Sequence, residues 1–321
     1  MTAASSLPRH WIALAGCFLL ACGAGITNAE PVPRLSLEQL DVTPSANWIS
    51  GEPGNMQLSP ASCRTMPDEA IAERILAVAL QEWAWFGFPE FEARSSRESV
   101  PSEPRVRRPR VSEDEASRIA TTIAGYWAAT PGGAWILGRQ NERWIGPDGV
   151  GARWRDAWSA AFISWVLCEG GAGSPERFRG AIAHHSYIDQ AIMAAQGQLE
   201  TPLYRAYDIG LNAIQAGDML CTGSRPEYRN LAARKAQLGE GARTHCDIVV
   251  GLDANGYLVT VGGNVQSLVR IKRMPWVDRQ AGIPQDPDGS PFFAHLVLQA
   301  PTTDPMPLSE LPVLQQLGYR P

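Results

Sequence analysis

The sequence lacks a surplus of basic residues. Its 321 residues include 28 Lys and Arg against 33 Asp and Glu, which gives a formal net charge of −5. Because nucleic-acid-binding proteins normally carry a basic surplus, we expect no nucleic-acid partner. The sequence also lacks internal repeats and the helical His-x-x-x-His spacing of zinc hydrolases. We therefore expect neither a bound metal nor another cofactor.

The apolar run near the N-terminus is short. It covers residues 11–22, follows Arg9 and His10, and has too few residues to cross a membrane. This pattern is typical of a signal peptide, which we assign to residues 1–29. Residues 19–22 resemble a bacterial lipobox, in which Cys22 becomes the lipidated first residue, whereas residues 27–29 suit an ordinary signal peptidase. Both alternatives predict an exported protein in the periplasm or at the outer membrane. A lipid anchor to the membrane is expected if Cys22 is modified.

Cysteine is scarce in the rest of the chain. Only Cys63, Cys168, Cys221 and Cys246 follow the predicted signal peptide. An even number of cysteines in an oxidising compartment indicates disulfides. We expect a Cys221–Cys246 bond, because both residues fall on strands that are predicted to be neighbours. Cys63 and Cys168 then form the second pair or stay as two buried thiols.

The order of the predicted elements indicates an α+β fold. Residues 30–66 are rich in Pro, Ser and Asn and are predicted to be a tether or an irregular lead-in. Residues 67–300 form the single predicted domain, and residues 301–321 are a C-terminal extension. Helical patterns come first, and short apolar strands follow from Gly217 onward. We predict a five-stranded antiparallel meander of residues 218–221, 245–252, 257–262, 268–273 and 295–298.

One predicted helix, at residues 158–166, is apolar nearly all the way round. A helix of this kind is expected to be buried on every side. Ser159 stands in its first turn, at the positive end of the helix dipole. A nucleophile-type side chain in this position is a recurring element of hydrolase sites.

The order of three polar features along the chain resembles that of papain-like amidases of bacterial cell walls, of the CHAP and NlpC type. Ser159 comes first, His245 opens a later strand, and Gly262-Gly263-Asn264 ends the next strand. In CHAP-like proteins the helix reads Trp-Cys-Ala-Ala-Phe-Val. Here residues 158–163 read Trp-Ser-Ala-Ala-Phe-Ile.

A closer resemblance, over roughly residues 70–299, is to the bacterial family known as domain of unknown function 2272. The matching motifs lie at residues 79–83, 86–87, 126–127, 158–165, 217–221, 245–250 and 262–264. The resemblance implies a papain-like fold, in which the buried helix packs on the sheet and further helices precede it. It also implies hydrolysis of amide bonds in the cell wall.

The resemblance predicts a catalytic triad of Ser159 as nucleophile, His245 as general base and Asn264 as the residue that orients it. The chain departs from the amidases because Ser159 replaces cysteine. A serine hydroxyl does not form a stable ion pair with histidine in advance, as a thiol does. It needs a base that removes its proton during attack and an oxyanion hole that holds the developing charge.

Four further side chains are candidates for supporting roles. Asp247 points to the same strand face as His245 and is positioned to orient it. His184 and His185 are alternative bases. Asp156 is a candidate cap of the Ser159 helix, which would leave free backbone N–H groups as oxyanion donors.

Three functions follow from these features. The first is an exported envelope hydrolase, an amidase or peptidase that cleaves cell-wall peptide bonds. The second is a non-catalytic envelope lipoprotein that binds glycan, peptide or protein, which the missing cysteine and the 11 Trp residues favour. The third is an esterase or acyl transferase, because a serine nucleophile suits that chemistry equally well.

Overall fold

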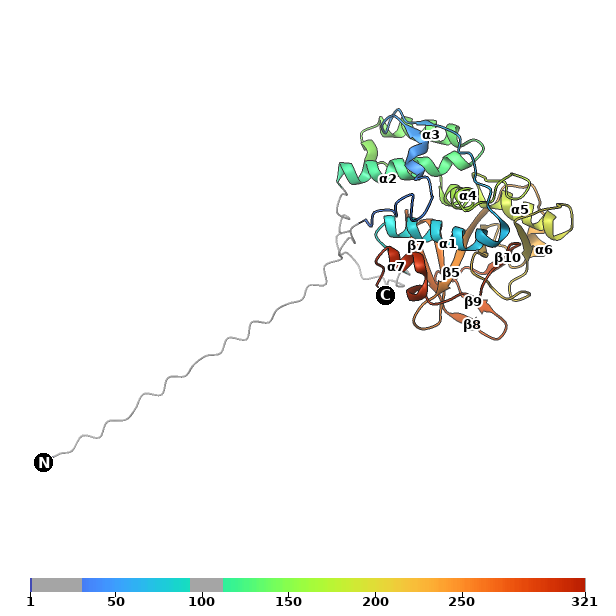
Figure 1. Cartoon of the computed structure of the whole chain (residues 1–321). Helices are drawn as coiled ribbons and strands as arrows, with labels where there is room; N and C mark the ends of the chain where they lie inside the picture. Colours follow the sequence, from blue (N-terminus) through green and yellow to red (C-terminus); the bar gives the residue numbers. More distant parts are fainter. Residues whose placement is uncertain (2–30, 93–111, 321) are drawn as a thin grey trace.

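The computed structural model describes residue 1, residues 31–92 and residues 112–320 (Figure 1). Helices and strands both contribute, so the fold is α+β. The α-helices in these residues are α1 (Asp68–Trp85), α2 (Glu113–Tyr126), α3 (Gly133–Trp144), α4 (Ser159–Glu169), α5 (His184–Ala195), α6 (Leu231–Lys235) and α7 (Pro312–Gln316). Short 3-10 helices are η1 (Ser45–Trp48), η2 (Trp127–Ala129), η3 (Gly149–Gly151) and η4 (Leu308–Glu310).

The main sheet has six antiparallel strands in the order β3-β10-β4-β5-β6-β7. Their bounds are β3 (Tyr204–Tyr207), β4 (Met219–Arg225), β5 (Arg243–Leu252), β6 (Leu258–Val265), β7 (Leu268–Met274) and β10 (Phe292–Leu298). Two small ribbons pair β1 (Ile49–Ser50) with β2 (Gln57–Leu58) and β8 (Trp276–Asp278) with β9 (Ile283–Pro284).

The prediction of a five-stranded meander is wrong in two respects. Strand β3 adds a sixth member, and only β4 to β7 follow one another as a meander. Strand β10 returns to lie between β3 and β4. The sequence hides β3 because this edge strand has only four residues and no hairpin turn joins it to β4.

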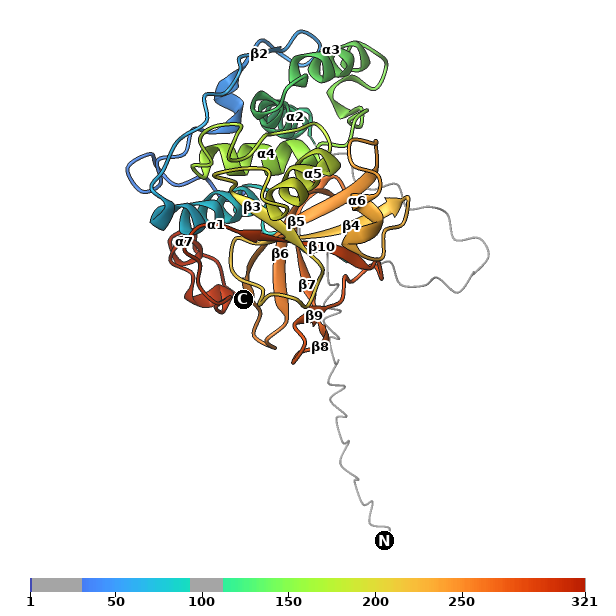
Figure 2. The same ribbon diagram turned by 90° about the vertical axis from the view of Figure 1, so that its right-hand side faces the viewer.

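Helix α4 is buried along its whole length, as its apolar sequence predicts. It contacts β5 and β6 of the sheet, and helices α1 and α2. Figure 2 shows α4 and α5 side by side above the sheet. The first turn of α4 therefore faces the region where α5 meets the start of β5.

Residues 31–66 pack on the domain instead of forming the expected free tether. The Val32 N–H donates to the Ala84 carbonyl at 3.2 Å. The Arg34 guanidinium makes two hydrogen bonds, of 2.5 and 2.9 Å, to the fully buried carboxylate of Glu82. A segment of polar composition and little regular structure is thus held by a few specific side chains. Composition alone does not reveal such contacts.

The last residues also pack on the domain. Helix α7 contacts α1, and the ring of Tyr319 lies 5.2 Å from the ring of Trp83. Leu314 is completely buried in this contact region. The predicted C-terminal extension, where it is described, is therefore part of the same core.

Two disulfides are present. Cys221 and Cys246 are directly paired on β4 and β5, which confirms the predicted bond. Cys63 and Cys168 form the second bond, so the alternative of two free thiols is excluded. This second bond fastens residues 31–66 to the last turn of α4.

We expect Arg34→Ala to lower the free energy of unfolding by about 3 kcal/mol, because Glu82 would stay buried without a counter-charge. Urea unfolding monitored by circular dichroism measures this change. The control is Arg229→Ala, because the Arg229 side chain is 83% exposed and lies 3.7 Å from Glu227. No measurable change is expected for the control. Equally small effects in both variants would show that residues 31–66 contribute little to stability.

Candidate active site

Ser159 is the first residue of α4 and is 7% exposed. No side chain caps this helix; its N-cap is Trp158, whose carbonyl accepts the Phe162 N–H at 3.0 Å. The backbone N–H groups that precede Phe162 in the first turn have no partner within the helix. Ser159 thus combines a hydroxyl, a helix N-terminus and free backbone donors.

The proposed capping role of Asp156 is not observed. Its carboxylate lies 3.5 Å from the Arg139 guanidinium and makes no cap hydrogen bond to α4. The helix begins later in the chain than this role requires, because its N-cap is Trp158 and not Asp156.

His184 is the imidazole that meets Ser159. Its Nε2 lies 2.6 Å from the Ser159 Oγ, and the His184 side chain is only 4% exposed. The residue opens α5, which contacts β3, β5 and β10 of the sheet and is joined to α6 by the Asp189–Arg234 ion pair. Burial lowers the pKa of His184 well below its usual range, and the neighbouring His245 lowers it further. His184 is therefore neutral near pH 7.

The partners of the other ring nitrogen determine the tautomer of His184. The Cys246 backbone N–H donates to Nδ1 at 3.2 Å, and the Tyr187 hydroxyl also lies against Nδ1. An N–H group can only donate, so Nδ1 carries no proton and the single proton of the neutral ring sits on Nε2. His184 therefore donates to the Ser159 Oγ. In this tautomer it cannot accept the hydroxyl proton.

His245 lies directly beside His184, with ring centres 5.1 Å apart. Its side chain is 27% exposed, and its Nε2 lies 2.7 Å from the Asp247 Oδ1. This is the contact that the two-residue spacing along one strand face predicts. Because a carboxylate only accepts, Nε2 carries a proton, and in the neutral form of the ring Nδ1 keeps a lone pair. Nδ1 has no hydrogen-bond partner among the described residues.

A buried ion chain continues behind His245. Lys272 lies 3.0 Å from Asp247 and 2.9 Å from Asp286, and all three side chains are almost completely buried. Burial alone raises the pKa of Asp247, but His245 and Lys272 outweigh it and hold that pKa below its usual range. Burial raises the pKa of Asp286 to about 6, although Lys272 opposes the shift. Asp247 therefore stays ionised next to His245.

Asn264 and His185 lie outside this arrangement. Asn264 is in β6 with φ of 58°, and among the described residues no hydrogen bond joins it to His245. Its neighbour Gly263 packs so closely on Phe162 of α4 that a Cβ there would come within 2.5 Å of that side chain. The Nδ1 of His185 lies 3.1 Å from the Ala242 carbonyl. The structure thus joins His245 to Asp247 instead of to Asn264.

Tyr187 and Lys272 were not recognised as members of the site from the sequence. Tyr187 stands one helical turn after His184, a spacing that places two side chains on the same face. Lys272 alternates with apolar residues in β7, which is the usual pattern of a solvent-facing position. Its burial became evident only from the pairing of β7 with β6 and the cover provided by Asp286.

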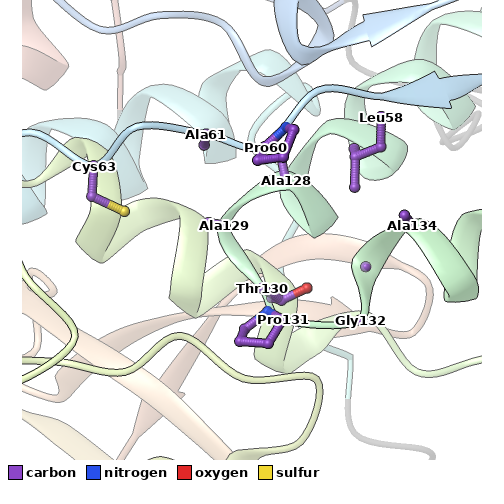
Figure 3. A pocket seen from close by; sticks show the side chains of 11 residues that line it. Leu58, Pro60, Ala61, Cys63, Ala128, Ala129, Thr130, Pro131, Gly132 and Ala134 are labelled. Atoms are coloured by element: carbon purple, nitrogen blue, oxygen red, sulfur yellow. The ribbon is translucent and has the colours of Figure 1, made fainter.

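Two hollows are lined by residues other than Ser159. One, of about 390 Å³, is lined by residues 128–134 and by residues between Leu58 and Cys63, mostly with apolar and backbone atoms (Figure 3). The other, of about 320 Å³, is lined by Arg139, Glu142, Arg143 and Arg155. In the described residues, no three His, Cys, Asp or Glu side chains gather as a potential metal site.

The disulfides indicate in which cellular compartment the protein lies. Two disulfides indicate an extracellular or periplasmic protein. In residues 31–92 and 112–320, no helix has both the length and the apolar character needed to cross a membrane. The predicted signal peptide and Cys22 lie outside the described residues.

We expect acid to destabilise the protein through His184. The unfolded chain binds a proton at this residue below about pH 6.5, whereas the folded chain keeps the ring neutral, so stability falls as the pH falls. The loss should therefore grow as the pH falls from about 6.5 towards about 5. Urea unfolding at both pH values measures it. His184→Gln should remove this part of the pH dependence; an unchanged slope in the variant would show that His184 is protonated in the fold.

Comparisons with known proteins identify the family but no characterised relative. No curated protein and no solved structure matches the chain. One family matches residues 122–295, which is more than half of the chain and contains Ser159, His184, His245 and Asp247. The chain belongs to this bacterial family, described as "Uncharacterized protein conserved in bacteria (DUF2272)".

Proposed function

We propose that the protein is an exported amidase or peptidase with a papain-like arrangement, in which Ser159 is the nucleophile. One observation carries this proposal: the hydroxyl at the start of buried helix α4 lies in a continuous group of polar side chains with His184, His245 and Asp247. Buried polar and charged groups are costly to fold. Their concentration around one serine is typical of a catalytic site.

The hydrogen-bond directions assign different roles to the two histidines. His184 fixes the position of the Ser159 oxygen through its Nε2 proton. His245 offers the free lone pair of Nδ1 and acts as the general base. Asp247 stabilises the imidazolium that forms, as a carboxylate does in a serine protease triad. Proton transfer from Ser159 to His245 proceeds through one water molecule or after rotation of the serine side chain.

The reaction follows the usual acyl-transfer sequence. The Ser159 Oγ forms a bond to the carbonyl carbon while its proton moves to His245. Backbone N–H groups of the first turn of α4 hold the oxyanion. The carbon–nitrogen bond then breaks as His245 returns the proton to the leaving amine. Water, activated by His245, releases the acyl group from Ser159.

The proposed substrate is peptide in the bacterial cell wall. Two disulfides support an extracellular or periplasmic location, which would give access to this polymer. The sequence resemblance to CHAP and NlpC amidases is the reason for proposing an amide bond. The same site suits an ester or an acyl acceptor other than water. Ester and amide probes of equal acyl group distinguish the esterase alternative.

A second candidate is a non-catalytic envelope protein that binds glycan, peptide or protein. The observation in its favour is that His184 donates a proton to Ser159 instead of accepting one. Ser159 and His184 are also almost enclosed. Both features suit a serine that has only a structural role.

Ser159→Ala and His245→Gln are each expected to reduce the release of peptides from purified peptidoglycan by at least about 10³-fold, because they remove the nucleophile and the base. Liquid chromatography with mass spectrometry quantifies the products. Ser186→Ala is the matched control, since Ser186 is an exposed serine of α5, and its rate should equal that of the wild type.

The three possible patterns separate the candidate functions. Loss of activity in both site variants, but not in the control, supports the hydrolase. Equal activity in all four proteins would contradict the assignment of Ser159 and His245. Retention of the wild type on peptidoglycan without any release of peptides would favour the non-catalytic protein.

We also propose that the chain is anchored to a membrane through a lipid on Cys22, with the outer membrane as its location. Cys22→Ala should then move the protein from the detergent-soluble membrane fraction to the soluble periplasmic fraction, while the disulfides still form. Labelling with an alkyne fatty acid measures the lipid directly. An unlabelled wild-type protein would instead favour cleavage after residue 29.

A further inference from the structure

One hollow, of about 320 Å³, is lined by charged side chains that take no part in the proposed reaction. These are Arg139, Glu142, Arg143 and Arg155. We call it the arginine hollow. Its residues come from α3 and from the loop that leads into α4. It is a shallow, open depression on the surface.

The arginine hollow is positively charged in a chain whose formal net charge is −5. Three guanidinium groups and one carboxylate line it. Arg139 is partly neutralised by Asp156 at 3.5 Å. Among the described residues, the guanidinium groups of Arg143 and Arg155 have no carboxylate partner. With Glu142 and Asp156 counted against the three arginines, one net positive charge remains, which favours an anionic ligand.

An aromatic side chain stands at the edge of the arginine hollow. Trp135 of α3 is 60% exposed, and the Arg139 guanidinium lies 4.4 Å from the centre of its ring. Arginine binds carboxylates through two parallel hydrogen bonds. An exposed indole provides an apolar plane on which a sugar ring can pack while its hydroxyls stay hydrated. The combination suits a sugar that carries a carboxylate.

The arginine hollow is also close to the candidate active site. Arg155 precedes Ser159 by four residues, so their Cα atoms are at most about 15 Å apart. A polymer bound at Arg155 would therefore have to extend over only a few sugar or amino-acid units to reach the serine.

We propose that the arginine hollow binds carboxylate-bearing glycan and positions that polymer beside Ser159. The choice of a glycan rests on the proposed cell-wall function. The charge and shape that recognise a carboxylate do not depend on catalysis.

The test measures binding with the full exported chain carrying Ser159→Ala, so that no substrate is consumed. Isothermal titration compares a tetramer of galacturonic acid with the neutral tetramer of N-acetylglucosamine. The site variant is Arg143→Gln with Arg155→Gln. The matched control, Arg153→Gln with Arg229→Gln, removes the same charge from exposed positions that do not line the hollow.

The carboxylated tetramer should bind at least about tenfold more tightly than the neutral one, since each charge-assisted contact contributes on this scale. The site variant should lose this preference, whereas the control should change by less than about twofold. Equal binding of both tetramers, or equal losses in both double variants, would overturn the proposal.

A second measurement distinguishes a membrane surface from a glycan. Vesicles of phosphatidylglycerol and phosphatidylcholine are sedimented with the same proteins. Vesicle binding that depends on Arg143 and Arg155, without binding of the carboxylated tetramer, would overturn the glycan proposal in favour of a lipid surface. Glycan binding by a wild-type protein that hydrolyses no peptidoglycan would contradict only the proposed function.

Discussion

The hydrogen bond from the Cys246 backbone N–H to the His184 Nδ1 is the constraint on which the candidate site depends. It fixes the ring proton on Nε2 and so decides that His184 donates to Ser159. The paired strands β4 and β5, joined by a disulfide, hold this N–H in place. The backbone of the sheet therefore sets the proton position next to the serine, and in the proposed hydrolase the base is the neighbouring His245.

The buried charges behind His245 also depend on one another. Asp247 is buried and stays ionised because Lys272 compensates its charge, and Asp286 compensates Lys272 in turn. Gly262, opposite Asp247 across the sheet, makes room for the carboxylate, since a Cβ there would lie 1.8 Å from Oδ1. The two glycines before Asn264 thus have a packing role. Gly262 leaves space for the Asp247 side chain, and Gly263 leaves space for the Phe162 side chain.

Much of the fold could be predicted because the spacing of apolar residues along a helix or strand indicates which of its faces is buried. The apolar α4 and the strands β4 to β7 have clear patterns. Three features could not be predicted from the sequence, because each depends on partners that are distant in the chain. They are the packing of residues 31–66, the edge strand β3 and the burial of Lys272. The site also depends on such distant partners. The two-residue spacing along β5 predicts the contact of Asp247 with His245. The position of His184 between Ser159 and His245 arises only when α5 packs next to α4.

The two disulfides join cysteines that are consecutive along the chain, Cys63 with Cys168 and Cys221 with Cys246. In a chain that crosses a membrane from its N-terminus, the first pair emerges before either member of the second. Each bond can then close as its second cysteine arrives, and no mispaired bond must be broken later. Oxidative maturation in order of emergence would therefore lock residues 31–66 onto α4 before the sheet that completes the site has formed.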